Sequence, residues 1–178
     1  APSGRRVYVH SLCMVLYKAV HDTFPGIRLR IEHSISNGYY VLFIQDGEIL
    51  TPAPAMVTTV KRRMREIIEQ DLPFVRHEKL TTDVIKVFKK QGLDDKVNLL
   101  KYSQDLYTVY YTLDGLADSF YGNLAPTTGY LQAFDLIPFK KGMLLMAFGK
   151  DDSRKPEQPV RQEKMYKAFT EYIDFNSI

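Results

Sequence analysis

The sequence lacks several features that would reveal a function directly. It contains a single cysteine, Cys13, so no disulfide can form within the chain. It has no stretch of about 18 consecutive apolar residues, the length that a membrane-spanning helix requires. The formal net charge of +3 is too small to indicate nucleic-acid binding by itself. Together these absences predict a cytoplasmic protein with no membrane partner.

Common catalytic motifs are also missing. The phosphate-binding pattern G-x-x-x-x-G-K-[ST] and the nucleophile pattern G-x-S-x-G occur nowhere in the chain. One cysteine cannot supply a paired-cysteine zinc site, and the four histidines are scattered along the sequence. The sequence therefore predicts neither a cofactor nor a metal for this chain.

What is present is the composition of one ordinary globular domain, with 45% hydrophobic and 25% charged residues. Hydrophobic periodicity predicts helices at 6–24, 53–71, 81–90, 94–100 and 159–175, and strands at 27–33, 39–44, 74–79, 106–113, 130–138 and 142–148. Asn37-Gly38 predicts a tight hairpin, Thr81 a side-chain cap for the third helix, and Gly92 the end of that helix. We expect an α+β fold, in which an antiparallel sheet has helices packed on one side.

The first predicted helix carries the most suggestive pair of side chains. His10 and Met14 are four residues apart, so they share one helical face. Two histidines at this spacing would be a familiar grip on a metal ion, but here the second position carries a thioether. Cys13 lies in the same apolar helix, where a cysteine usually packs inertly rather than acting as a nucleophile.

Four stretches occur in an order that resembles a known family. They are "VHSLCM", "HSISNGYYVLF", "ADSFYGNL" and "FDLIPFKKGMLLMAFGK". The order is similar to that of the second additional domain shared by threonyl- and alanyl-tRNA synthetases, in which a helix carries H-x-x-x-H and a later segment reads roughly D-x-C-x-G-x-H. The resemblance covers about residues 5–150, and it implies the α+β fold of that domain.

The resemblance also implies where an editing site would lie. The four reactive positions of the family, which discharge mischarged tRNA and bind metal in some members, fall on His10, Met14, Phe120 and Leu124. By analogy, Asn37 and Tyr121 lie near the same cleft. Only His10 keeps a residue type that can move a proton or bind zinc. We therefore predict a degenerate site with no catalytic residue and no metal.

The amino-acid sequence of these stretches also resembles the N-terminal region of bacterial uridine kinase-like proteins. This resemblance implies that residues 1–150 are an accessory module and that residues 151–178 lead toward a missing kinase domain. That domain would phosphorylate uridine or cytidine with ATP and magnesium, and the other domains of the parent chain would be partners. The spacing of five apolar residues predicts the amphipathic helix at 159–175: Val160, Met165, Phe169, Tyr172 and Ile173.

The sequence leaves two other functions open. A residual aminoacyl-tRNA editing hydrolase has His10 as its only support. An RNA-binding module would use the basic run that includes Lys61, Arg62 and Arg65, although a solvated charged face is the more economical interpretation. A nucleoside ligand at the old cleft and a homo-oligomer are further alternatives.

Overall fold

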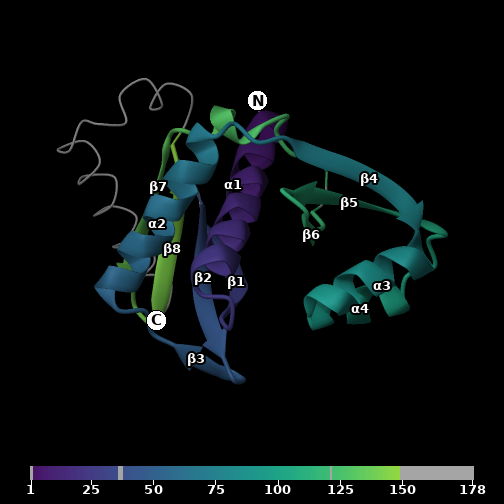
Figure 1. The fold of residues 1–178 in the computed structure, drawn as a ribbon, viewed down its shortest axis with the longest axis horizontal. Coiled ribbons are helices and arrows are strands. Elements are labelled where there is room, and N and C mark those ends of the chain that lie inside the picture. Colours follow the sequence, from purple (N-terminus) through teal and green to yellow (C-terminus); the bar gives the residue numbers. More distant parts are fainter. Residues whose placement is uncertain (1, 36–37, 121, 149–178) are drawn as a thin grey trace.

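The computed structural model describes residues 2–35, 38–120 and 122–148, which form two lobes (Figure 1). The larger lobe consists of α1 (Pro2–Thr23), β1 (Arg28–Ile35), β2 (Gly38–Gln45), β3 (Glu48–Leu50), α2 (Pro54–Glu69), η1 (Thr128–Tyr130), β7 (Phe134–Phe139) and β8 (Gly142–Ala147). The smaller lobe consists of β4 (Phe74–Leu80), α3 (Thr81–Gln91), α4 (Asp94–Lys101), β5 (Tyr107–Leu113) and β6 (Leu116–Asp118). None of the described helices is both long and apolar enough to cross a membrane.

The larger lobe is built on an antiparallel sheet with strand order β1-β2-β8-β7, and β3 pairs with the C-terminal end of β2. Helices α1 and α2 contact each other and cover one face of this sheet (Figure 1). The core between them contains fully buried side chains from both helices and from the sheet, among them Leu12, Met14, Leu16, Met64, Ile67, Phe43, Leu136 and Met143. This packing explains why α1 is apolar on most sides.

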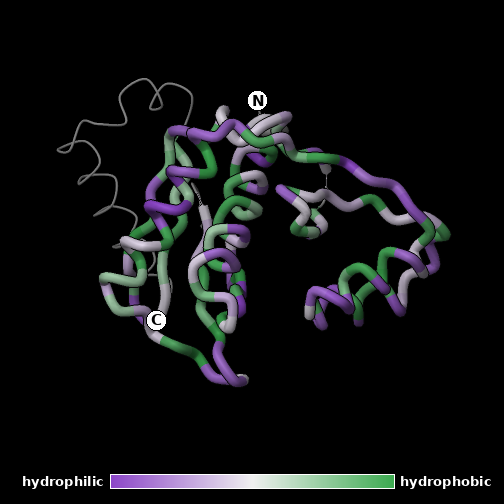
Figure 2. The backbone as a smooth tube through the Cα atoms, in the orientation of Figure 1, coloured by the Kyte–Doolittle hydropathy of each residue, from purple (hydrophilic) through white to green (hydrophobic). Residues whose placement is uncertain are grey.

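The smaller lobe is an insertion between α2 and β7. Its three-stranded sheet has the order β4-β5-β6, and Val84 and Phe88 of α3 pack with Tyr110 of β5 in a separate core. β4 is an edge strand that turns from hydrophobic at its start to hydrophilic along most of its length, as expected for an edge exposed to water (Figure 2).

Both ends of the insertion are joined at the same place. Pro73 forms an isolated bridge with Thr127. The Phe74 N–H donates to the carbonyl oxygen of Pro126 at 3.0 Å, and the Thr128 N–H donates to that of Leu72 at 2.8 Å. The smaller lobe therefore leaves and re-enters the larger one through two paired segments.

The structure confirms the α+β class and the antiparallel pairing of the first two strands, and it corrects several details. The strands form two sheets rather than one, and β3, β6 and η1 were not predicted. Tyr130 lies in η1 rather than in a strand. Gly92 does end α3, with a φ of 80° that favours glycine. The predicted linker and helix beyond residue 150 lie outside the described residues.

The predicted cap at Thr81 is wrong. The residue before α3 is Leu80, and no side chain caps the helix there. The Thr81 hydroxyl instead donates to the Asp105 carbonyl oxygen at 2.7 Å and lies 2.7 Å from the Thr108 hydroxyl. A tertiary contact across the smaller lobe has taken the place of the local one.

Candidate functional site

His10 lies on the side of α1 that meets the smaller lobe. Its ring stacks on Phe120, with 5.7 Å between the ring centroids, and on Tyr39 of β2 at 6.4 Å. The Tyr39 hydroxyl is 3.3 Å from His10 Nε2. Three segments far apart in the sequence therefore meet at one aromatic stack, and the structure brings His10 and Phe120 together.

The other two positions that the family resemblance assigns to the editing site, Met14 and Leu124, are buried. Met14 is completely inaccessible one turn along α1, and Leu124 is 7% exposed. Both belong to the core of the larger lobe. The Ala125 N–H donates to the Ser11 hydroxyl at 2.8 Å, and this bond fixes the loop after β6 against α1. Asn37 and Tyr121 are outside the described residues.

The residues at this site do not fit a zinc ion. Structural and catalytic zinc sites take nitrogen, thiolate or carboxylate ligands, and here one imidazole is accompanied by a thioether, a phenyl ring and an aliphatic chain. Within residues 2–35, 38–120 and 122–148, no three histidine, cysteine, aspartate or glutamate side chains are arranged to share a metal.

Cys13 lies on the same side of α1 and is 1% exposed. Burial raises the pKa of its thiol far above the ordinary value, and the nearby Asp118 carboxylate raises it further. A thiol acts as a nucleophile only after losing its proton. The environment of Cys13 therefore supports the interpretation as inert packing.

The most unusual polar pair near His10 is the one between Lys96 and Asp118, which sequence reasoning did not single out. Asp118 ends β6 and is 7% exposed; it accepts hydrogen bonds from the Lys96 ammonium group and, at 2.8 Å, from the Ser119 N–H. The Lys96 nitrogen lies 4.8 Å from the centre of the Phe120 ring. Burial raises the pKa of Asp118, although both hydrogen-bond donors oppose that rise.

Asp118 stands in the stretch "ADSFYGNL", so the sequence could have suggested it. Lys96 gave no signal, because a lysine in the first turns of the short helix α4 reads as an ordinary surface residue. Only the folding of the smaller lobe brings this ammonium group to the end of β6.

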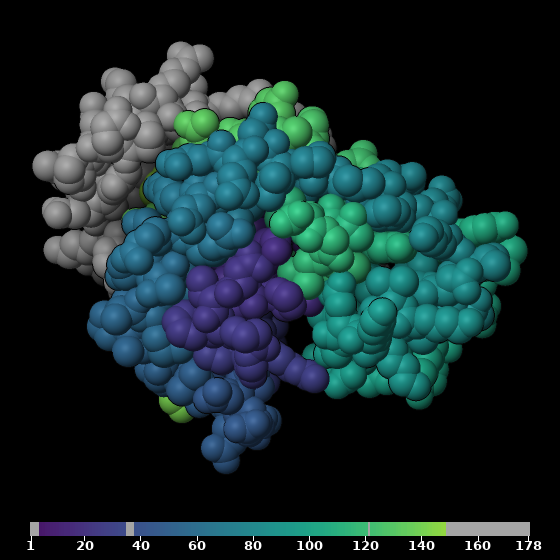
Figure 3. All heavy atoms as spheres, viewed as in Figure 1, coloured from purple at the N-terminus to yellow at the C-terminus, as the bar shows by residue number. Residues whose placement is uncertain are grey.

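A second polar contact joins the two lobes beside this pair. The Gln91 side chain of α3 donates to the Tyr17 hydroxyl at 3.1 Å and to the Ala117 carbonyl oxygen at 2.8 Å. Burial raises the pKa of Tyr17 to about 12. His10, Cys13 and Tyr17 thus line one face of α1 toward the smaller lobe, and Figure 3 shows a narrow hollow between α1 and the α3–α4 pair.

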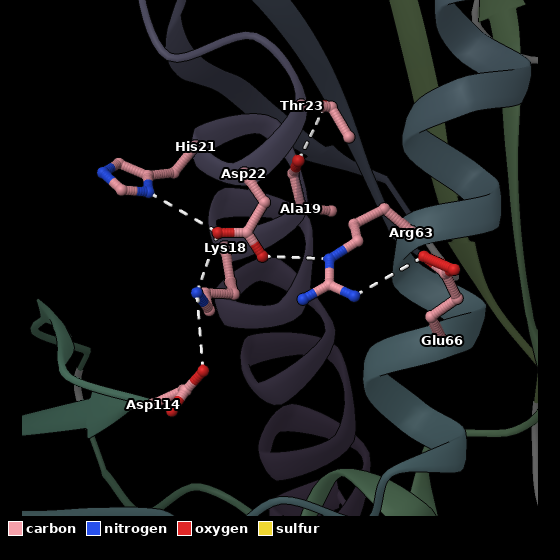
Figure 4. Close-up of polar contacts among 8 residues, drawn as sticks. All are labelled: Lys18, Ala19, His21, Asp22, Thr23, Arg63, Glu66 and Asp114. Atoms are coloured by element: carbon pink, nitrogen blue, oxygen red, sulfur yellow. Dashed lines mark hydrogen bonds and ion pairs between the residues drawn. The ribbon is translucent and has the colours of Figure 1, made fainter.

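A charged cluster connects α1 with α2 and with the turn between β5 and β6 (Figure 4). Asp22 accepts hydrogen bonds from Lys18 at 2.8 Å and from Arg63 at 3.0 Å, and Lys18 also lies 3.8 Å from the Asp114 carboxylate. Burial of Asp22 favours its neutral form, but the two basic partners outweigh that effect and lower the pKa of the carboxyl group. The cluster therefore helps to hold the lobes together.

The three basic candidates for nucleic-acid binding differ in their surroundings. Lys61 forms an ion pair with Asp135 at 2.5 Å. Arg65 donates to the carbonyl oxygens of Gln132 and Phe134 at 2.9 and 3.3 Å. Arg62 is exposed. Two of the three side chains therefore already fasten α2 to β7 and the segment before it.

Comparison with known proteins gives the relationship of this chain. No family model matches it. It is 32% identical to the threonine–tRNA ligase of Desulforamulus reducens over 136 residues, which is 75% of this chain and 21% of that protein. The threonine–tRNA ligase of Carboxydothermus hydrogenoformans is 30% identical over 135 residues, with 75% and 21% coverage. That of Azobacteroides pseudotrichonymphae is 26% identical over 154 residues, with 85% and 23% coverage.

The matched region spans about a fifth of the length of these curated relatives. The names of these relatives agree with the resemblance of the sequence motifs to tRNA synthetases. The relationship to uridine kinase-like proteins stays a prediction. This chain is homologous to a region of threonine–tRNA ligases.

Proposed function

We propose that the chain is a non-catalytic accessory module of a larger protein, built on a synthetase editing scaffold whose reactive centre has been replaced by packed side chains. The observation that carries this proposal is the stack of His10 on Phe120, with Met14 buried one helical turn away. Hydrolysis by acid–base catalysis needs several groups that exchange protons near neutral pH. Phenyl and thioether groups cannot do so.

Deacylation of a tRNA charged with the wrong amino acid tests this proposal directly. We expect the chain to leave the rate of deacylation at that of buffer alone, and His10→Ala to change nothing. Deacylation by the chain that His10→Ala abolishes would overturn the proposal.

Restoring the residue types that the synthetase family carries at these positions provides a test with a different readout. The triple variant Met14→His, Phe120→Cys and Leu124→His would put two further imidazoles and a thiol at the positions that the family resemblance assigns to the editing site together with His10. Because zinc favours such nitrogen and sulfur ligands, we expect the variant to acquire about one zinc ion per chain, measured by elemental analysis. The single variant Leu124→His is the control and should acquire none. A folded triple variant without zinc would show that the four positions do not form one site.

The Lys96–Asp118 pair favours a second candidate, a residual editing hydrolase. A buried carboxyl group with a raised pKa can act as a general acid or base, and here it lies beside an ammonium group and near the His10 stack. For this function, Asp118→Asn would abolish deacylation while leaving the fold intact. The absence of activity in the unmodified chain would exclude it.

Binding of RNA without chemistry is a weaker alternative. The exposed Arg62 could contact a phosphate, but Lys61 and Arg65 are engaged within the molecule. Phosphate contacts release counterions, so true binding to RNA would weaken steeply with added salt. A mobility-shift titration at two salt concentrations distinguishes such binding from none.

We infer further, from the sequence resemblance alone, that the parent protein is a uridine kinase-like nucleoside kinase. The module would then accompany a domain that uses ATP and magnesium to phosphorylate uridine or cytidine. The test is phosphoryl transfer from labelled ATP to uridine by the full-length parent. A parent that attaches threonine to tRNA, and does not phosphorylate uridine, would contradict this inference.

A further inference from the structure

The larger sheet has a second apolar face, opposite α1 and α2. Along β8, Met143 and Leu145 point into the main core, whereas the intervening Leu144 and Met146 belong to a separate cluster. That cluster, called here the outer cluster, consists of Tyr40, Ala133, Ile137, Phe139, Leu144, Met146 and Phe148. Leu144 is completely inaccessible and Met146 is 2% exposed. β8 is therefore buried on both faces.

The outer cluster crosses three adjacent strands. Leu144 is paired with Tyr40 of β2 on one side and with Ile137 of β7 on the other. The Tyr40 ring meets the Phe139 ring edge-on, with 5.9 Å between their centroids. This row forms a continuous apolar surface on the sheet, and monomeric soluble proteins rarely expose such a surface to water.

No described helix covers this surface. Within residues 2–35, 38–120 and 122–148, every member of the outer cluster comes from β2, β7 or β8 or from a residue just beside them. The helices α1 and α2 pack on the opposite face. A covering element must therefore come from another part of this chain or from another molecule.

The sequence after β8 has the properties of such an element. Phe148, itself a member of the outer cluster, ends the described chain, and ten residues (149–158) precede the segment 159–175. Met165, Phe169, Tyr172 and Ile173 follow the i, i+4, i+7, i+8 spacing of one helical face. On a helix of this register, Lys167 would fall on the opposite face.

The lengths agree as well. A helix over 17 residues would extend about 25 Å, and the six residues of β8 extend about 20 Å. Ten connecting residues can reach up to about 33 Å, which is enough for the chain to turn back over the sheet. We propose that residues 159–175 cover the outer cluster of the same chain as an amphipathic helix, with Phe169 among the residues that face the sheet.

The complete absence of tryptophan makes this proposal testable by fluorescence. In the full-length chain, Phe169→Trp introduces a single reporter on the apolar side of the segment, and Lys167→Trp introduces one on the polar side. We expect blue-shifted emission and several-fold weaker acrylamide quenching for the first variant only. Equal, water-like emission from both would overturn the proposal.

A second substitution identifies the surface that the reporter touches. Ile137 is half-buried in the outer cluster. Ile137→Asp in the Phe169→Trp background should therefore shift the tryptophan emission to the red. If this variant does not fold, the milder Ile137→Ser takes its place. Val75→Asp, at an exposed position of the smaller lobe, is the control and should have no effect. Tryptophan emission that Ile137→Ser leaves unchanged in a folded chain would overturn the assignment. A blue shift that disappears on dilution would also overturn it, because the loss would identify a second copy of the chain as the covering element.

Discussion

Replacement of Lys96 by methionine tests the electrostatics of the site most directly. Asp118 is 7% exposed, and Lys96 is the only basic side chain that bonds to it among the described residues. Methionine keeps much of the length of the lysine side chain but removes its charge. The buried carboxylate would then lose its ionic partner and keep only the hydrogen bond from the Ser119 N–H.

The magnitude follows from the burial of the two partners. Removing one member of a fully buried ion pair costs about 3–5 kcal/mol. The Lys96 side chain is 29% exposed, so water screens part of the interaction, and we expect a loss of about 2–3 kcal/mol at pH 7. For a domain of this size, that loss lowers Tm by roughly 5–10 °C.

The loss should also depend on pH in a defined direction. The pKa of Asp118 is raised by burial, and removal of Lys96 raises it further. A carboxyl group with a raised folded-state pKa makes its full stabilising contribution below its unfolded-state pKa, and this contribution is lost as the pH rises through the folded-state pKa. The deficit of Lys96→Met should therefore be small near pH 4 and grow toward pH 7.

Thermal unfolding of the two chains at several pH values, followed by circular dichroism, measures this deficit. The double variant Lys96→Met, Asp118→Asn is the control, and it should recover most of the stability because no charge is left buried. A deficit that is the same at pH 4 and pH 7, or that persists in the double variant, would refute the electrostatic explanation.

Three further predictions concern other parts of the molecule. Gly38→Ala should lower the free energy of unfolding by about 3 kcal/mol or more, because the new methyl group would lie 1.8 Å from the Leu145 carbonyl oxygen; in urea titrations the control Gly4→Ala, in open space, should be neutral or stabilising. Asp22→Asn should cost about 1 kcal/mol at pH 7 and less as the pH falls through the lowered pKa of Asp22, where the wild-type carboxylate is itself neutralised; unfolding at pH 7 and pH 3 tests this. Cys13 should resist maleimide at pH 7.5 and react fully in denaturant, and rapid labelling of the folded chain would contradict its burial.

The sequence was a good guide wherever local patterns decide structure. The alternation at 27–33 located the first strand, and Gly92 located the end of α3, because side-chain period and backbone freedom act within a few residues. Asn37-Gly38 indicated the hairpin between the first two strands, but Gly38 lies within β2, paired with Ile35, and does not supply the positive φ that was expected of it. Thr81 shows the limit of this reasoning. Its hydroxyl had a local role available, but the fold gave it partners more than 20 residues away.

The candidate site residues came from the family resemblance rather than from local patterns. The positions of His10 and Phe120 came from motif order, and the structure stacks the two rings. The Lys96–Asp118 pair could not be predicted from spacing, because its 22-residue separation is closed only when the smaller lobe folds. Periodicity likewise identifies a strand but does not say which of two sheets it joins.

The order of strands in the larger sheet affects how this protein folds while it is being synthesised. β8 lies between β2 and β7, and its residues Leu145 and Met146 pair with Tyr39 and Gly38, more than 100 positions earlier in the chain. During translation, the hairpin of β1 and β2 emerges long before its central neighbour β8, so its inner edge stays unpaired while residues 46–141 are made. The last described strand to leave the ribosome is therefore the one that closes the sheet, and chaperones have the greatest opportunity to bind in that interval.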